Sequence, residues 1–447
     1  MPGRLRLMTD PHDTCEVTGP AVEQTPSLGQ AAAQLLRNGG AAGVLLLVRD
    51  IVNVAAVRQR DLSDYAAVDG SAMLQIAYVG LCLCYVVYHL SQFRPAGAAY
   101  LLRRTPAWIL FVYTGLCALS SLWSPDVVLT AYRSVECLCH LLLIVIVCDN
   151  LSWTCRSRQE MIEWLVTWAL WVLIWDTLYF ARMVRLGPMF FSIYIFRRGS
   201  FALGTLFFLT VFASRRKLFI AINLLYMPLS LANTTYFGVF FGLLGGLWAG
   251  DRRFQVAFFF LVGTIALVLL VMGPAALQHT LFYGQDGVGL EHTTGRDRMF
   301  LYALEYGMNR PLHGYGFVAG ETSALWAQHL KAISAHNVFT SALLAIGVTG
   351  PILFIAFFAW LSAIVIRADL PDHWRPAFLG TVIMIFAVSS ASPGLGTRVY
   401  GSWVPVVLAS VGMCAIARWE HLALLHGAIP EESLGYGAVM TGQDLAG

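Results

Sequence analysis

The stretch FQVAFFFLVGTIALVLLVM (254–272) decides the fold class of this chain. It contains 19 residues and no charged side chain, and a helix of about that length crosses the ~30 Å hydrocarbon layer of a membrane. Because a backbone in lipid must satisfy its own hydrogen bonds, such a segment crosses as a helix. The stretch therefore predicts a membrane-spanning α-helix.

The composition of the whole chain points the same way. Hydrophobic residues make up 57% of the 447 residues and charged residues 12%, and the mean hydropathy is +0.66. Soluble proteins carry about 25% charged residues, so the composition excludes an ordinary soluble enzyme. Similar apolar stretches recur along the chain, and we expect an all-α polytopic membrane protein.

About twelve segments qualify as membrane-spanning helices. They are 36–57, 71–90, 106–122, 128–148, 161–181, 200–213, 217–232, 234–249, 254–272, 336–366, 377–392 and 401–417. The first contains Arg49-Asp50, an adjacent opposite pair that either neutralises itself or extends to the head groups. The segment 336–366 is too long for one simple span, and Gly347 and Gly350-Pro351 predict a bend within it.

The distribution of Arg and Lys orients these segments. With the N-terminus in the cytoplasm, 16 of the 29 basic residues fall inside, 11 outside and two within helices, as the positive-inside rule requires. The predicted layout is a disordered cytoplasmic tail (1–35), nine helices (36–272), a long periplasmic loop (273–335), three helices (336–417) and a cytoplasmic tail (418–447). The first residues lack the hydrophobic core of a cleavable signal.

The long loop carries the groups that point to chemistry. Apolar or aromatic residues at 299, 300, 303, 304 and 307 recur at helical spacing, which predicts an amphipathic helix on the membrane, beginning after Gly295 and ending at Pro311. A Gly-Tyr-Gly turn follows. The acids of the loop are scattered, so a divalent-metal site built by the loop alone is not expected. Its arginines are donors suited to phosphate.

Two loop segments carry a family resemblance. GRDRMFLYALEYGMNRPLHGYGF (295–317) and AHNVFTSALLAIGVTG (335–350) together resemble the shared domain of O-antigen ligases and Wzy-type polysaccharide polymerases. The shared features are the Gly-Arg pair, the Pro-Leu-x-Gly-x-Gly turn, the His-Asn pair and the Gly-x-x-Gly ending. SSLWSPDVVLTAYRS (120–134) and RRGSF (197–201) are further, weaker similarities, whereas 202–206 and 233–238 depart from the family pattern.

The resemblance implies a GT-C-like membrane glycosyltransferase that works without a metal or other cofactor. Its substrate would be a polyprenyl-diphosphate-linked glycan, joined to an acceptor hydroxyl at the periplasmic face of the bacterial inner membrane. Such an enzyme is surrounded by membrane lipids and works beside a chain-length regulator and export proteins; a nucleic-acid partner is not expected.

Residue roles follow from that reaction. The leaving lipid diphosphate needs positive charge, which Arg296 and one or both of Arg197 and Arg198 would supply. The acceptor hydroxyl needs a base that titrates near neutral pH, and His336 suits that role. The expected catalytic residues are therefore His336 and Arg296, and the expected substrate-binding residues are Arg197, Arg198, Arg133, Asn337 and Tyr315.

Other interpretations stay open from the sequence. Arg133 stands three residues before Glu136, so it either forms a simple helical ion pair or shapes the site through a buried one. Tyr315 either binds substrate or only closes its turn. The same chemistry also fits an O-antigen ligase that transfers finished glycan to lipopolysaccharide core. A transporter is the alternative from another class, although the sequence has no internal repeat of the kind many transporters have.

Overall fold

The computed structural model describes residues 40–56, 69–93, 96–185, 207–213, 233–250, 255–264, 296–327, 337–391 and 403–425, with a few isolated positions between them (204–205, 221–222, 252–253 and 335). Within these ranges the regular elements are helices, and none is a strand. The expected all-α fold class is therefore confirmed for the described residues.

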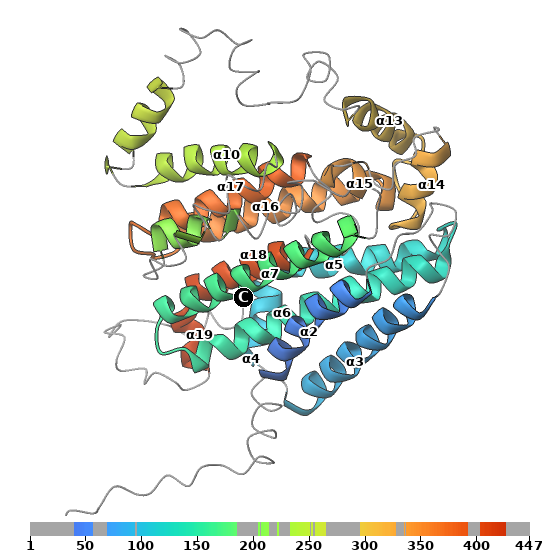
Figure 1. Ribbon diagram of the computed structural model, residues 1–447, viewed down its shortest axis with the longest axis horizontal. Coiled ribbons are helices and arrows are strands. Elements are labelled where there is room, and N and C mark those ends of the chain that lie inside the picture. Colours follow the sequence, from blue (N-terminus) through green and yellow to red (C-terminus); the bar gives the residue numbers. More distant parts are fainter. Residues whose placement is uncertain are drawn as a thin grey trace, which may run out of the picture.

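The principal helices follow one another along the chain (Figure 1). They are α2 (Gly40–Ala55), α3 (Gly70–Phe93), α4 (Ala96–Arg104), α5 (Ala107–Leu119), α6 (Val127–Thr154), α7 (Arg158–Arg185), α10 (Asn233–Ala249), α13 (Arg296–Met308), α14 (Ala319–Ala327), α15 (Val338–Ile346), α16 (Thr349–Arg367), α17 (Arg375–Ala391), α18 (Trp403–Ala417) and α19 (Trp419–Leu425).

Helix α6 forms the centre of the packing. It contacts α2, α3, α4, α5, α18 and α19. Within its apolar stretch of 18 residues, 78% is buried inside the protein. In α3 the corresponding share is 33%, and exposed apolar side chains cover its outer face. The described residues leave this apolar side of α3 uncovered, as a lipid-facing helix would require.

Small residues let α10 approach α17 closely. Gly238, Gly242 and Gly246 recur every four residues, and a Cβ added at Gly242 would meet the carbonyl oxygen of Gly380 at 2.6 Å. A Cβ at Gly246 would meet the carbonyl oxygen of Pro376, also at 2.6 Å. Membrane helices commonly pack through such small-residue stripes because dispersion contacts replace the missing hydrophobic drive.

The long segment 336–366 is divided as its glycines predict. Helix α15 ends at Ile346, Gly347 adopts φ 75°, and α16 begins at Thr349. A positive φ is readily available only to glycine. Gly350 lies in the first turn of α16, where a Cβ would meet the carbonyl oxygen of Ala342 at 2.5 Å. The bend therefore depends on both glycines.

Four helices are long and apolar enough to cross a membrane: Gly70–Gln92, Val127–Thr154, Arg158–Tyr179 and Thr349–Arg367. Two bent pairs raise the total to six if each is one span, namely α4 with α5, bent by 80°, and α18 with α19, bent by 76°. These numbers concern the described residues alone. The predicted total of twelve stays a prediction, since most of 217–232 and much of 254–272 lie outside those residues.

Three elements differ from expectation because their amphipathic faces are covered by the protein. Helix α4 occupies what was expected to be a cytoplasmic loop, and it buries Ala98 and Leu101. Helix α19 continues the packed structure beyond residue 418 and buries Leu422. In α13 the predicted apolar positions divide: Ala303 and Gly307 are buried, while Phe300 and Leu304 are exposed. Ala303 and Gly307 pack against α15. Only part of the predicted apolar face is therefore free to lie on a membrane.

Helices α13 and α14 lie together at the right-hand end of the molecule in Figure 1, beside α15, whereas α19 lies at the left. The connection Asn309–Val318 joins α13 to α14, and Ser120–Asp126 joins α5 to α6. We call the two connections together with α13 and α14 the loop end. Hydrogen bonds unite these parts, as described next.

Candidate functional site

The connection from α13 to α14 is a tight turn built on positive backbone angles. Gly314 has φ 63° and Gly316 has φ 106°, and Val318 is a non-glycine residue with φ 58°. A Cβ at Gly316 would meet the side chain of Ser124 at 2.6 Å. The predicted Gly-Tyr-Gly turn is therefore confirmed, and its glycines are required by both conformation and space.

This turn caps the end of α15. The amide of Tyr315 donates to the carbonyl of Leu344 at 2.6 Å, and the amide of Gly316 donates to that of Ala345 at 3.0 Å. In return the amide of Val348 donates to the carbonyl of Pro311 at 2.7 Å. The last carbonyls of a helix lack hydrogen-bond partners within it. The amides of the turn therefore supply donors to the carbonyls of Leu344 and Ala345, whose helix ends before Gly347.

The connection from α5 to α6 holds the same turn from the other side. Phe317 donates its amide to the Ser120 hydroxyl at 3.0 Å, and its carbonyl accepts from the Thr130 hydroxyl at 2.8 Å. The indole of Trp123 donates to the carbonyl of His313 at 2.9 Å. Three segments that carry the family resemblance, 120–134, 295–317 and 335–350, thus form one hydrogen-bonded unit.

Asn337 fixes the start of α15. Its side-chain oxygen accepts from the amides of Phe339 at 2.8 Å and Thr340 at 3.3 Å, as an N-cap residue does. Its side-chain nitrogen donates to the carbonyl of Ser390, near the end of α17, at 2.8 Å. One side chain therefore caps its own helix and ties that helix to another.

Glu321 of α14 is a buried acid that the sequence analysis did not single out. Its Oε1 accepts from the amide of Ala335 at 2.8 Å and from the hydroxyl of Ser341 at 2.7 Å, and the residue is 1% exposed. In the sequence it was one of the scattered acids of the loop, and no signal distinguished it from the others. Its partners could not be read from the sequence, because Ser341 lies 20 residues away.

The predicted base and several predicted cations lie outside the described residues. His336, Arg197 and Arg198 are among them, and for Arg296 the structure describes only the backbone, at the first position of α13. Both covalent neighbours of His336 are described, however. Ala335 bonds to Glu321 and Asn337 bonds to Ser390, so the chain is anchored on either side of position 336.

Tyr315 joins α13 to the turn. Its hydroxyl donates to the carbonyl of Tyr306 at 3.0 Å, the two rings stack with centroids 4.5 Å apart, and the guanidinium of Arg310 lies 4.8 Å from the Tyr315 centroid. Burial raises the pKa of the Tyr315 phenol above its usual value, so the hydroxyl remains a donor at neutral pH. These contacts give Tyr315 a structural role in the turn.

Arg133 lies on α6 and forms a buried ion pair with Glu136 at 2.7 Å. The helical pair considered from the sequence is therefore present. Both side chains are buried, so the pair is a buried ion pair, which was the other alternative from the sequence. The guanidinium lies 5.2 Å from the ring centroid of Tyr132 as well.

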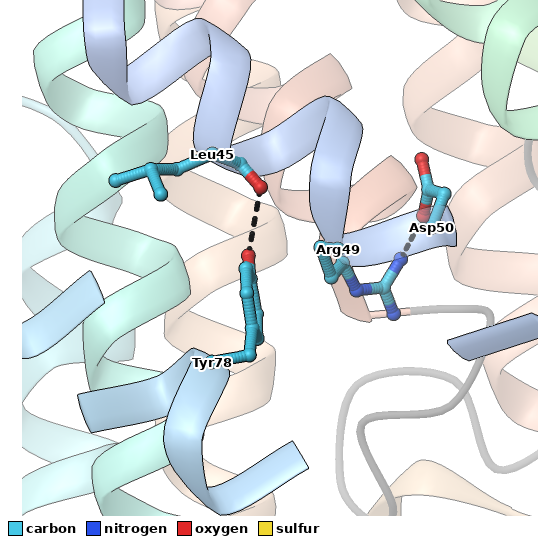
Figure 2. Close-up of polar contacts among 4 residues, drawn as sticks. All are labelled: Leu45, Arg49, Asp50 and Tyr78. Atoms are coloured by element: carbon cyan, nitrogen blue, oxygen red, sulfur yellow. Dashed lines mark hydrogen bonds and ion pairs between the residues drawn. The ribbon is translucent and has the colours of Figure 1, made fainter. Parts of the chain in front are cut away.

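A second buried ion pair lies on α2. Figure 2 shows Arg49 and Asp50 paired on α2, with Tyr78 of α3 beside them. The ion pair measures 2.7 Å, and the Tyr78 hydroxyl donates to the carbonyl of Leu45 at 2.9 Å. The Tyr78 ring also stacks on His140 of α6, with centroids 6.0 Å apart. The pair thus neutralises itself rather than extending to head groups.

Metal-binding potential is absent from the part of the chain that the structure describes. No group of three or more His, Cys, Asp and Glu side chains there could hold a metal ion. The described cysteines are free thiols, and all except Cys84 are buried.

Comparisons with known proteins add no support to the family resemblance, which depends on the sequence motifs. No protein-family model matches the chain, and no curated protein matches it.

Proposed function

We propose that this protein is a glycosyltransferase that polymerises polyprenyl-diphosphate-linked oligosaccharide units at the periplasmic face of the bacterial inner membrane. The observation that supports the proposal is the hydrogen-bonded unit at the loop end. Segments 120–134, 295–317 and 335–350 are far apart in sequence, and their motif residues contact one another there. Catalytic groups need such a rigid scaffold.

The proposed reaction uses the side chain at position 336 as a base. The His336 imidazole takes the proton of an acceptor hydroxyl, and that oxygen attacks the anomeric carbon of the donor sugar. The bond from this carbon to the lipid diphosphate breaks, and its electron pair leaves with the diphosphate. Arg296, together with Arg197 or Arg198, stabilises the charge that develops on the diphosphate. No metal takes part in the proposed step.

The anchored chain around position 336 suits such a base. A general base must stay within hydrogen-bond reach of the proton that it abstracts. Ala335 and Asn337 are held by α14 and α17 respectively, which restricts the backbone between them. An imidazole at the end of an apolar helix would also lie near head-group depth, where the diphosphate of a lipid carrier is found.

The test uses purified full-length protein in nanodiscs. The donor is lipid-linked oligosaccharide extracted from cells that lack this gene, supplied without a second acceptor. We expect a ladder of products in multiples of the repeat unit. We also expect His336→Ala and Arg296→Gln to lower the rate at least about 100-fold. The controls His373→Ala and Arg367→Gln should leave the rate unchanged, because they change an exposed residue of the connection after α16 and the exposed last residue of α16.

Other outcomes would redirect the proposal. Transfer only after lipopolysaccharide core is added would indicate a ligase that uses the same chemistry. The protein in this assay must be folded, and active membranes serve as the positive control. If no transfer occurs with either acceptor, glycosyl transfer is rejected and a transporter is favoured. A His336→Ala protein with the wild-type rate would reject the base.

A further inference from the structure

Helices α4 and α19 leave the ends of two longer helices at steep angles. Helix α4 is bent by 80° from α5, and α19 is bent by 76° from α18. The two short helices contact each other at the end of the molecule away from α13 and α14 (Figure 1). An amphipathic helix bent this far from a spanning helix runs along the surface of the membrane rather than through it.

The exposed side of this helix pair is basic. Helix α4 buries Ala98 and Leu101 and exposes Arg103 and Arg104 in its last turn. Arg418, directly before α19, is exposed as well. The three arginines therefore lie at the two bends, beside the residues where α5 begins and α18 ends.

A contact between two rings brings the basic ends together. Tyr100 of α4 and His421 of α19 have ring centroids 4.4 Å apart. Arg103 follows Tyr100 by three residues, and Arg418 precedes His421 by three and interacts electrostatically with it. The amide of Leu422 donates to the Arg418 carbonyl at 3.0 Å, so Arg418 shares the first turn of α19. Residues three apart on a helix are neighbours, and both arginines thus lie about one turn from the same ring contact.

The surroundings of these arginines suit the head-group layer of a membrane. Trp108, four residues beyond Arg104, is 43% exposed, and tryptophan is enriched at the level of the head groups. The acid of α19, Glu420, is paired with Arg158 at 2.8 Å, and α4 contains no acid. The exposed side of the helix pair therefore carries an excess of positive charge.

We propose that Arg103 and Arg418, with Arg104 beside them, bind the phosphate of an anionic phospholipid head group in the cytoplasmic leaflet. Guanidinium groups donate to phosphate oxygens, and basic residues next to the ends of spanning helices attract anionic lipids. A lipid is the source of this phosphate because both helices run along the membrane at this site. The site is independent of the proposed glycosyl transfer, which takes place at the loop end.

The experiment measures how fast individual arginines of the full-length protein react with phenylglyoxal, which modifies guanidinium groups. The protein is placed in nanodiscs of phosphatidylcholine alone or of equal parts phosphatidylcholine and phosphatidylglycerol, and modified residues are identified by mass spectrometry of peptides. A third sample contains phosphatidylcholine nanodiscs and inorganic phosphate at the same concentration as the phosphatidylglycerol. Arg252 and Arg367, which are exposed elsewhere in the chain, serve as internal controls.

We expect phosphatidylglycerol to slow the modification of Arg103 and Arg418 about 10-fold, and to change Arg252 and Arg367 little. Inorganic phosphate should protect none of them. Because one head group contacts both guanidinium groups, Arg103→Gln should remove most of the protection of Arg418. The matched variant Arg252→Gln removes the same charge at another exposed position and should leave that protection unchanged.

Four results would overturn the inference. Unchanged modification of Arg103 and Arg418 would show that no head group binds there. Equal slowing at Arg252 and Arg367 would show a general effect of surface charge. Equal protection by inorganic phosphate would assign the site to free phosphate, and full protection of Arg418 in Arg103→Gln would show that the two arginines do not share a head group. None of these results depends on the outcome of the glycosyl-transfer assay.

Discussion

Asp50 illustrates how much a single buried charge depends on its partner. It is 5% exposed and Arg49 is 2% exposed, and the two form their ion pair across one peptide bond. Burying either charge without compensation is costly in a membrane protein, where no solvent replaces the lost partner. The pair explains how α2 carries two charges among apolar residues.

We predict that Asp50→Asn destabilises the protein by about 3 kcal/mol, because it removes the counter-charge of a buried Arg. The double change Arg49→Met with Asp50→Leu should restore most of the loss, since it removes both charges. The thermal midpoint in detergent measures both. Asp372→Asn is the matched control, because Asp372 forms a 4.0 Å pair with Arg375 and its side chain is 72% exposed; it should change the midpoint little. Equal effects at 50 and 372 would contradict the prediction.

Among the elements, α10 and α17 depend on close backbone approach. A Cβ at Gly242 would lie 2.6 Å from the carbonyl oxygen of Gly380 and 2.5 Å from the ring of Phe208. Neither can yield easily, since one is backbone and the other is a fully buried ring. The two helices would have to separate to admit even a methyl group.

We therefore predict that Gly242→Ala destabilises the protein by about 1–3 kcal/mol, the usual range for overpacking. Gly80→Ala in α3 is the control, because a Cβ there meets nothing within 4 Å. It should be neutral or slightly stabilising, since alanine favours helix more than glycine does. Thermal midpoints of the two variants decide the matter, and a tolerated Gly242→Ala would show that α10 does not pack as closely as described.

For the whole molecule, the arrangement of its two ends can be tested independently of any activity. The proposed orientation puts the loop end outside the cytoplasm and the connection between α16 and α17 inside. Leu312 is 79% exposed at the loop end, and His373 is exposed in the other connection. The positive-inside rule is the physical basis of this orientation.

We predict that a cysteine at position 312 reacts with a membrane-impermeant maleimide in intact spheroplasts, whereas one at position 373 reacts only after permeabilisation. The exposed native thiol at Cys84 is replaced by Ser in both proteins to remove its background. Labelling in the reverse order would overturn the orientation and move the proposed chemistry to the cytoplasmic side.

Much of this architecture is encoded locally in the chain. Apolar runs predicted the long helices that the structure describes, although not the short helices α4 and α19. The glycines at 347 and 350 predicted the break between α15 and α16, and Gly295 predicted the start of α13, which ends at Met308 rather than at Pro311. A self-neutralising pair was one of the two alternatives that the adjacent charges 49 and 50 left open. Such features depend on residues a few positions apart, whose spacing and conformational preferences are visible in the sequence itself.

Only the tertiary structure decided which groups meet at the loop end. The bonds from Glu321 to Ser341, from Asn337 to Ser390 and from Trp123 to His313 join residues 20, 53 and 190 positions apart. Likewise, Ala303 and Gly307 belong to a face that the sequence assigned to the membrane, and α15 covers them. Hydropathy distinguishes buried from polar faces but does not say what buries them, because lipid and protein interior are both apolar. The partner of each face is set by how the helices pack.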